Sequence, residues 1–280
     1  MATCYRHPDR ETGVSCSNCG NPICPDCMTP TPVGMRCPNC ASDRTKVKTI
    51  RNVQSEPRVT YVLIALCVIA FLAEGQFGFQ ARGGSQLYVD WALLGKGFDG
   101  QHYIGVAEGD YWRLITGGFL HAGLLHIAFN MYLLYVLGNI LEPALRSVRF
   151  ALLYFAALLA GSAGALIVTP HALTVGASGA VFGLMGATFL EMRARGMDPM
   201  AGGVFGSIGG LIIINLVFSF AISGISVGGH IGGLIGGALV ALVYQAADRM
   251  RQPALAYAGA IAVGAISAGI GIAVAGSNGL

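Results

Sequence analysis

The sequence predicts an all-α membrane protein of seven transmembrane helices, preceded by a small cysteine-rich module. Of its 280 residues, 54% are hydrophobic and only 11% are charged, and the mean hydropathy is +0.62, values far from those of an ordinary soluble domain. Apolar runs long enough to cross a bilayer as helices lie near 59–79, 114–140, 147–168, 176–194, 204–223, 227–247 and 254–276. These runs are continuous, rich in glycine and without strand-like alternation, which favours helices over a β-barrel.

The first element is a module at residues 1–45 that contains seven of the eight cysteines. Four pairs of metal-ligand residues occur in it, each with two residues between its members: Cys4 and His7, Cys16 and Cys19, Cys24 and Cys27, Cys37 and Cys40. A tight turn lets such a pair present both side chains to one tetrahedral metal, so four pairs predict two structural zinc ions. Disulfides would need an oxidising compartment, whereas the charge pattern places this segment in the cytoplasm.

The role expected for the zinc is to fold a segment too short to build its own core. The module is also expected to dock a cytoplasmic protein partner. Nucleic acid is not an expected partner, because the module has few basic residues and no basic stripe, and the whole chain has a net charge of only +3. We expect the module to contribute no catalytic residue.

The order in which the pairs share metals is not fixed by their spacing. The segment resembles a B-box-like, cross-braced zinc finger, and this resemblance implies that the first pair binds with the third and the second with the fourth. A sequential arrangement remains possible.

The next element is a polar linker, residues 46–58, which carries basic residues just before the first span. Further basic residues follow spans two, four and six, whereas the connections after spans three and five have no lysine or arginine. The basic residues of the linker and of these three connections are Lys46, Lys48, Arg51, Arg58, Arg146, Arg149, Arg193, Arg195, Arg249 and Arg251. The positive-inside rule therefore predicts a cytoplasmic N-terminus and an external C-terminus, in the cell membrane. The first forty residues are polar and cysteine-rich, so no cleavable signal peptide is expected.

The second span carries polar residues that would be costly in lipid: His121, His126 and Asn130. His126 and Asn130 are four apart and share one helix face. His121 is five before His126, which turns it away on a regular helix, so it is expected at the outer mouth of the span or in an irregular first turn. Each residue alone is explained by hydrogen bonds between helices, but two stacked donors on one face weaken that explanation.

The fourth and sixth spans are expected to pack closely. His230 in span six is followed by Gly233 and Gly237, and span four offers small residues of its own after Ser178. Spans two, four and six all begin at the external face. Ser178 and His230 then lie roughly 5 Å below their helix starts, at the depth of His126 and Asn130.

A hydroxyl, an imidazole and side-chain donors at one depth are the groups that acyl transfer needs. No carboxylate is placed to complete a triad, because the candidates lie at the cytoplasmic ends or in the first external loop: Glu191, Asp198, Asp248, Asp90, Asp99, Glu108 and Asp110. The sequence therefore predicts a Ser/His dyad. Asn215 is expected to be a structural hydrogen bonder, and Ser219, Ser223 and Ser226 are set aside as nucleophiles because none follows a GxSG turn.

These motifs together resemble the rhomboid family of intramembrane serine proteases: GASG around Ser178, GGHIGG around His230, HAGLLHIAFN in span two, and Trp112 with Arg113 in the loop before it. The resemblance covers residues 59 to about 247 and implies a six-helix protease core at 59–250. The seventh helix, in the additional segment 251–280, is an extension seen in some members.

Carried over by residue, the resemblance implies that Ser178 is the nucleophile and His230 the general base, with no cofactor for catalysis. It implies that the oxyanion is held by the Ser178 N–H, His126 and Asn130, with His121 in the same polar cluster near the water entrance. The resemblance implies supporting roles for Gly176 and Gly179 of the GASG motif. Phe182 occupies the position where the family often has a tyrosine packed on the histidine. Trp112 and Arg113 would brace the first external loop.

The function expected is hydrolysis of peptide bonds in or next to transmembrane segments of membrane-protein substrates, with lipid as the surrounding partner. Span five and the loop before His230 are the expected gate. The alternative is a non-catalytic rhomboid-like binding or quality-control factor, which would have no need of a dyad. A transporter or channel would predict a repeated half-structure or acidic residues at mid-membrane, and the sequence has neither.

Overall fold

The computed structural model describes residues 2–42, 56–75, 78 and 85–277, and its contacts divide the chain into two units, Met1–Gln54 and Ser55–Leu280. Most of the predicted polar linker at 46–58, including Lys46, Lys48 and Arg51, lies outside the described residues. The two units are considered separately.

The first unit is built from short strands and turns. Strand β1 (Ala2–Cys4) pairs antiparallel with β2 (His7–Thr12), and β3 (Thr29–Thr31) pairs with β4 (Gly34–Arg36). A short 3-10 turn, η1 (Pro25–Cys27), and helix α1 (Pro38–Ser42) complete it. Its buried cluster consists of five cysteines and Ile23. An apolar core this small does not hold a fold by itself, which agrees with the expected dependence on metal.

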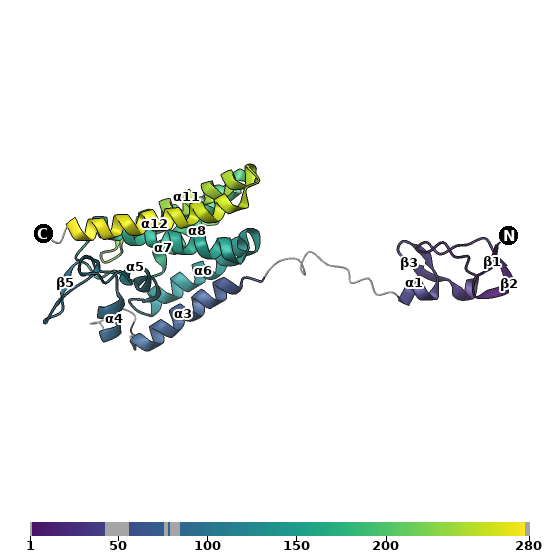
Figure 1. Ribbon diagram of the computed structural model, residues 1–280, viewed down its shortest axis with the longest axis horizontal. Coiled ribbons are helices and arrows are strands. Elements are labelled where there is room, and N and C mark those ends of the chain that lie inside the picture. Colours follow the sequence, from purple (N-terminus) through teal and green to yellow (C-terminus); the bar gives the residue numbers. More distant parts are fainter. Residues whose placement is uncertain (1, 43–55, 76–77, 79–84, 278–280) are drawn as a thin grey trace. The chain divides into compact units, whose positions relative to one another are not determined.

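In the second unit, each of the seven predicted apolar runs contains a helix (Figure 1). These helices are α3 (Arg58–Glu74), α6 (Leu124–Leu145), α7 (Ser147–Val168), α8 (Ser178–Ala194), α10 (Ile208–Ala221), α11 (Val227–Arg249) and α12 (Pro253–Ser277). Four of them, α6, α7, α11 and α12, are long and apolar enough to cross a membrane. Helix α10 has only 14 residues.

Some predicted boundaries were wrong. The second helix begins at Leu124 rather than near 114, because Gly117, Gly118 and Gly123 break the apolar run. Before it the chain forms the single turns α5 (Arg113–Thr116) and η3 (Gly117–Phe119). The run predicted at 204–223 is divided into α9 (Gly203–Gly206) and α10 by Ser207, whose side chain caps α10 by accepting the Gly210 N–H.

Helix α7 lies at the centre of the bundle and packs against α8, α11 and α12, while α3 packs against α6 (Figure 1). Helices α8 and α11 approach each other closely. A Cβ added to Gly183 would lie 2.9 Å from the Gly233 carbonyl oxygen, and one added to Gly237 would strike the backbone of Gly183. The close approach expected from the glycines is therefore present.

The segment between α3 and α5 forms the first loop, which contains α4 (Gln86–Trp91), the hairpin of β5 (Gly97–Phe98) and β6 (Tyr103–Ile104), and η2 (Val106–Glu108).

Glu142 of α6 is hydrogen-bonded to the start of α3, at the end of the bundle away from the first loop. Its carboxylate accepts the Val59 and Thr60 N–H groups at 2.9 and 2.8 Å and the Ser147 hydroxyl at 2.6 Å. Glu142 thereby satisfies donors in the first turn of α3 that have no acceptor within the helix.

Candidate active site

Ser178 is the first residue of α8, at the end of a loop that is tied to the first loop. Leu93 and Thr174 exchange backbone hydrogen bonds at 3.0 and 2.9 Å, and the Gly176 N–H donates to the Gly117 carbonyl at 2.9 Å. The serine side chain is half-buried. Because Ser178 opens the helix, its backbone N–H has no acceptor within α8 and lies at the positive end of the helix dipole.

His126, in the first turn of α6, has its tautomer set by a backbone group. The Ala122 N–H donates to its Nδ1 at 3.2 Å. A neutral imidazole carries one proton, so with Nδ1 accepting, the proton resides on Nε2. His126 Nε2 is therefore a donor.

The His126 ring packs against Gly176, next to Ser178, and leaves no room there for a side chain. A Cβ built on Gly176 would lie 2.7 Å from His126 Nε2 and 3.6 Å from Ser178 Oγ. Gly176 also has φ +123°, a backbone conformation that favours glycine. Glycine at position 176 thus allows the His126 ring, with its N–H donor, to lie close to the nucleophile candidate.

The other polar residues of span two have local partners. Asn130 is buried and donates one amide proton to the His126 carbonyl at 2.9 Å, which leaves its second proton for another acceptor. His121 precedes α6, as expected for an irregular first turn, and is fully buried. Its ring lies edge-on to that of His126, with ring centroids 5.2 Å apart.

His230 lies in the first turn of α11 and is buried, with 8% of its surface exposed. Phe182 stacks on the imidazole, with ring centroids 4.2 Å apart and an interplanar angle of 19°. This is the contact expected for position 182. His230 Nδ1 lies 2.6 Å from Ser219 Oγ on α10.

Ser178 and His230 come from facing turns of α8 and α11. The residues beside them, Gly179 and Gly229, are in backbone contact, because a Cβ on Gly179 would lie 3.3 Å from the Gly229 carbonyl oxygen. Within the part of the chain that the structure describes, Ser178 and His230 share no hydrogen bond. Catalytic hydrogen bonds are often long without substrate.

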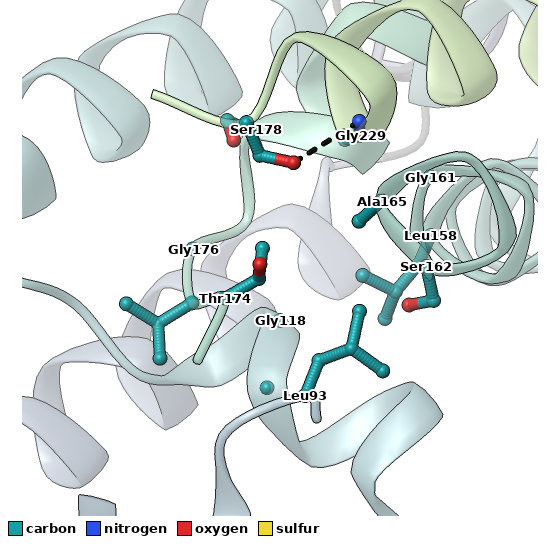
Figure 2. Close-up of a pocket in the computed structure, with 14 residues that line it drawn as sticks. Leu93, Gly118, Leu158, Gly161, Ser162, Ala165, Thr174, Gly176, Ser178 and Gly229 are labelled. Carbon is teal, nitrogen blue, oxygen red and sulfur yellow. Dashed lines mark hydrogen bonds between the residues drawn. The ribbon is translucent and has the colours of Figure 1, made fainter. Parts of the chain in front are cut away.

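A small cavity adjoins Ser178 between α7, α8, α11 and the first loop. Figure 2 shows Ser178 and Gly229 on one side of it and Leu158 and Ser162 of α7 across from them. It has about 30 Å³ of room for water, whereas one buried water needs about 10–15 Å³. The site therefore has room for water next to the hydroxyl.

Trp112 and Arg113 hold the first loop together. Arg113 is 2% exposed, and its Nε donates to Asp110 at 2.9 Å while Nη1 donates to the Val89 and Ala92 carbonyls at 2.6 and 3.0 Å. The Trp112 indole N–H donates to the Asp90 carbonyl at 3.2 Å. These contacts are of the bracing kind expected for both residues.

Sequence reasoning missed two polar residues near the site. Glu74, at the end of α3, is 3% exposed and accepts the His121 N–H at 3.1 Å. The sequence signal for Glu74 was a carboxylate at the end of an apolar run. The other is Ser219, which had been considered only as a competing nucleophile. The only local sequence signal for Ser219 was its position four residues after Asn215, on the same helix face.

The carboxylates set aside in the sequence have partners of their own. Asp110 pairs with Arg113, Glu191 with Arg195 and Asp248 with Arg149. None of the carboxylates in the described ranges is hydrogen-bonded to His230.

The residues predicted to bind metal in the first unit gather in two clusters that could each hold an ion: Cys4, His7, Cys24 and Cys27, and Cys16, Cys19, Cys37 and Cys40. Within each cluster the ligand atoms lie within 4.8 Å of one another. This grouping is the interleaved one rather than the sequential one. Sulfur and imidazole donors in sets of four suit zinc.

The two clusters differ in exposure. In the first, His7 Nδ1 lies 3.3 Å from Cys24 Sγ and 3.4 Å from Cys27 Sγ, and all three cysteines are buried. In the second, Cys19 is exposed. Hydrogen bonds from the backbone at Cys19 and Cys37 lower the pKa of Cys16 to about 6, which favours the metal-binding thiolate.

The fold and the site define the class: a helical membrane protein with a serine and a histidine on facing helices and imidazole donors beside them. A profile of the rhomboid domain matches residues 108–247, half of the chain. The chain belongs to the rhomboid family, and it is an integral membrane protein.

The chain is similar to several curated rhomboid proteins. Rhomboid protease GluP of Bacillus subtilis is 37% identical over 195 residues, which cover 69% of this chain and 36% of GluP. Putative rhomboid protease YdcA of the same organism is 35% identical over 142 residues, 50% of this chain and 70% of YdcA. Rhomboid-like protease 1 of Toxoplasma gondii is 31% identical over 169 residues, 58% of this chain and 57% of that protein. The chain thus spans about a third of GluP and more than half of the other two.

Proposed function

We propose that this protein is an intramembrane serine endopeptidase that cleaves membrane-protein substrates in or next to a transmembrane segment, with Ser178 as nucleophile and His230 as general base. The observation that carries the proposal is the close packing of the His126 ring against Gly176, beside Ser178. A nucleophile with an N–H donor beside it suits a tetrahedral intermediate. A binding role without catalysis would leave this arrangement unexplained.

In the proposed reaction, Ser178 Oγ attacks the scissile carbonyl carbon and its proton passes to His230. The oxyanion forms beside Ser178 and accepts from His126 Nε2–H and the Ser178 N–H, with the second Asn130 amide proton as a further donor. His230 then gives its proton to the leaving amine, so the peptide C–N bond breaks and Ser178 is acylated.

Water completes the reaction. A water molecule from the cavity beside Ser178 loses a proton to His230 and attacks the ester carbon. The ester bond breaks, Ser178 recovers its proton and the new carboxyl terminus leaves. Bulk water reaches the site poorly, because His230 is buried and the cavity has an apolar lining. The hydrolytic water is therefore expected to come from the cavity itself.

The substrate is expected to be a helix that unwinds near the cut, because a membrane helix hides its amides in hydrogen bonds. Segments with glycine, alanine or proline are favoured, since these residues unwind readily or fit the confined site. Helix α10 is the proposed gate, because it is short and presents Val217, Phe218 and Phe220 outward.

The proposed orientation follows the basic residues. Arg146, Arg193 and Arg249 lie where α6, α8 and α11 end, and Glu142 ties the first turn of α3 to the same end of the bundle. By the positive-inside rule this end faces the cytoplasm, so Ser178 opens toward the external side and the chain before α3 is cytoplasmic. The cell membrane is the proposed location.

We also propose that each cluster of the first unit holds one structural zinc ion, which cross-links segments that have almost no apolar core. The module, taken as residues 1–45, would then dock a cytoplasmic protein. The protease core is taken as 59–250, with α12 in the additional segment 251–280.

The function is tested by reconstituting the full chain in liposomes with a transmembrane substrate rich in glycine and alanine at its outer boundary. Wild type should cleave it, whereas Ser178→Ala and His230→Ala should reduce kcat by at least about 10⁴-fold, as expected when a nucleophile or its base is removed. Ser277→Ala, an exposed serine at the end of α12 and away from the proposed gate, is the matched control and should cleave normally. Full activity in both dyad variants would refute the mechanism.

A further inference from the structure

His230 has an unusual partner for a catalytic base. Its Nδ1 lies 2.6 Å from Ser219 Oγ, which belongs to α10, the proposed gate. Both side chains are buried, with 3% of Ser219 and 8% of His230 exposed. Water therefore competes little for this hydrogen bond.

The direction of this hydrogen bond follows from counting protons. A serine hydroxyl has one proton, and Ser219 Oγ lies 2.7 Å from the Asn215 carbonyl oxygen, to which it donates. Toward His230 it is left with lone pairs, so His230 Nδ1 must supply the proton. The reverse direction would leave two oxygens 2.7 Å apart with no proton between them.

This direction settles what the other ring nitrogen can do. A neutral imidazole with its proton on Nδ1 has a free lone pair on Nε2, the form that can take a proton from a serine hydroxyl. Phe182 stacks on the ring and restricts its tilt. Ser219 restricts the remaining freedom, rotation of the ring within that stack.

We propose that Ser219 is a positioning residue, a neutral third member of the site that holds His230 in the Nδ1–H tautomer where a triad would use a carboxylate. The inference rests on the proposed role of His230 as general base. It agrees with the absence of a carboxylate on His230 among the described residues. It also makes the base dependent on α10, since displacement of that helix removes the acceptor.

The size of the effect is bounded by chemistry. A neutral hydroxyl stabilises the imidazolium of the transition state less than a carboxylate does. Loss of a hydrogen bond that orients a reactive side chain typically costs about 10- to 100-fold. We expect Ser219→Ala to lower kcat by that factor and to leave KM unchanged, because Ser219 does not touch substrate in the proposed reaction.

Two variants and one spectroscopic signal test the proposal in the full chain. Ser219→Thr keeps a hydroxyl that can bond both the carbonyl four residues earlier and His230, so it should recover most of the activity lost in Ser219→Ala. Ser277→Ala, an exposed serine at the end of α12, is the control for removing a serine away from the gate. Nitrogen NMR of ¹⁵N-histidine-labelled protein in liposomes reports the tautomer directly, with the His230 signal assigned by its loss in His230→Ala.

The expected result is a His230 signal with Nδ1 protonated in wild type, a shift toward the Nε2–H form in Ser219→Ala, and a kcat loss in that variant alone. An Nε2–H signal in wild type, or a Ser219→Ala enzyme with the kcat of Ser277→Ala, overturns the proposal. If Ser219→Thr does not fit the buried site, the His230 tautomer in Ser219→Ala still tests the proposal. Failure of wild type to cleave would instead contradict the proposed function, because the NMR signal is read without substrate.

Discussion

Gly176 is the residue on which the geometry of the site depends most closely. Its missing side chain lets the His126 ring lie close to Ser178, because a Cβ at this position would strike the ring. At this scale, the site requires a residue without a side chain as much as it requires reactive groups. The backbone at φ +123° also favours glycine.

We predict that Gly176→Ala lowers kcat/KM by about 100-fold or more, the loss typical of a blocked oxyanion donor. The new methyl would lie 2.7 Å from His126 Nε2, and the left-handed backbone adds strain. Gly196→Ala is the matched control, because Gly196 has φ +72° and open space around it. Cleavage assays on both should separate the clash with His126 from backbone strain, and equal activities would contradict the importance of close packing at Gly176.

The sequence could predict individual residues where a motif combined type and spacing. Ser178, His230, His126 and Asn130 were predicted in this way, and their roles stay predictions. Phe182 stacks on His230, where the family resemblance implied a ring. Ser219 was misjudged, because a serine in an apolar helix has a common structural explanation. Its contact with His230 depends on the rotation of α10 against α11, which no local pattern encodes.

At the scale of elements, the starts of helices carry the residues of the proposed site. Ser178, His126 and His230 all lie in first turns, where backbone donors are free and the chain can be capped or broken. The periodicity of the apolar runs predicted the helices but not their starts. Helix α6 begins ten residues later than predicted because glycines at 117, 118 and 123 release the chain into turns.

Glu142 supports the opposite end of the bundle, and we predict that Glu142→Ala lowers the free energy of unfolding by about 3 kcal/mol. The change removes the acceptor of the Val59 and Thr60 N–H groups and leaves them buried without a partner. Glu191→Ala is the control, since its pair with Arg195 is partly exposed and should be worth less than about 1 kcal/mol. Unfolding in mixed micelles measures both, and equal losses would contradict the anchoring role.

At the scale of the whole molecule, two kinds of stability are combined in one chain. The helical unit rests on close packing around α7, whereas the first unit has a buried cluster made of cysteines and Ile23. Sequence spacing predicted the metal-ligand residues but left open how they divide between two metals, because that depends on how the strands fold back. The interleaved clusters supply the missing information.

We predict that a strong zinc chelator unfolds the first unit and leaves the chemistry of the second intact. Two zinc ions per chain should be released, one from each cluster, as measured with a colorimetric zinc indicator. Residues 2–42 should then become sensitive to protease, while cleavage of a reconstituted substrate keeps its kcat. Removal of residues 1–45 should likewise change assembly or stability more than turnover, and a folded truncation without any activity would contradict this division.

The central claim is that Ser178 is a nucleophile activated by His230 at the outward end of α8. A fluorophosphonate probe applied to reconstituted protein, followed by mass mapping of the labelled peptide, tests it most directly. We predict that the adduct forms on Ser178 in wild type, forms much more slowly in His230→Ala and is absent in Ser178→Ala. Labelling on another serine, or equal labelling of Ser178 without His230, would contradict the account.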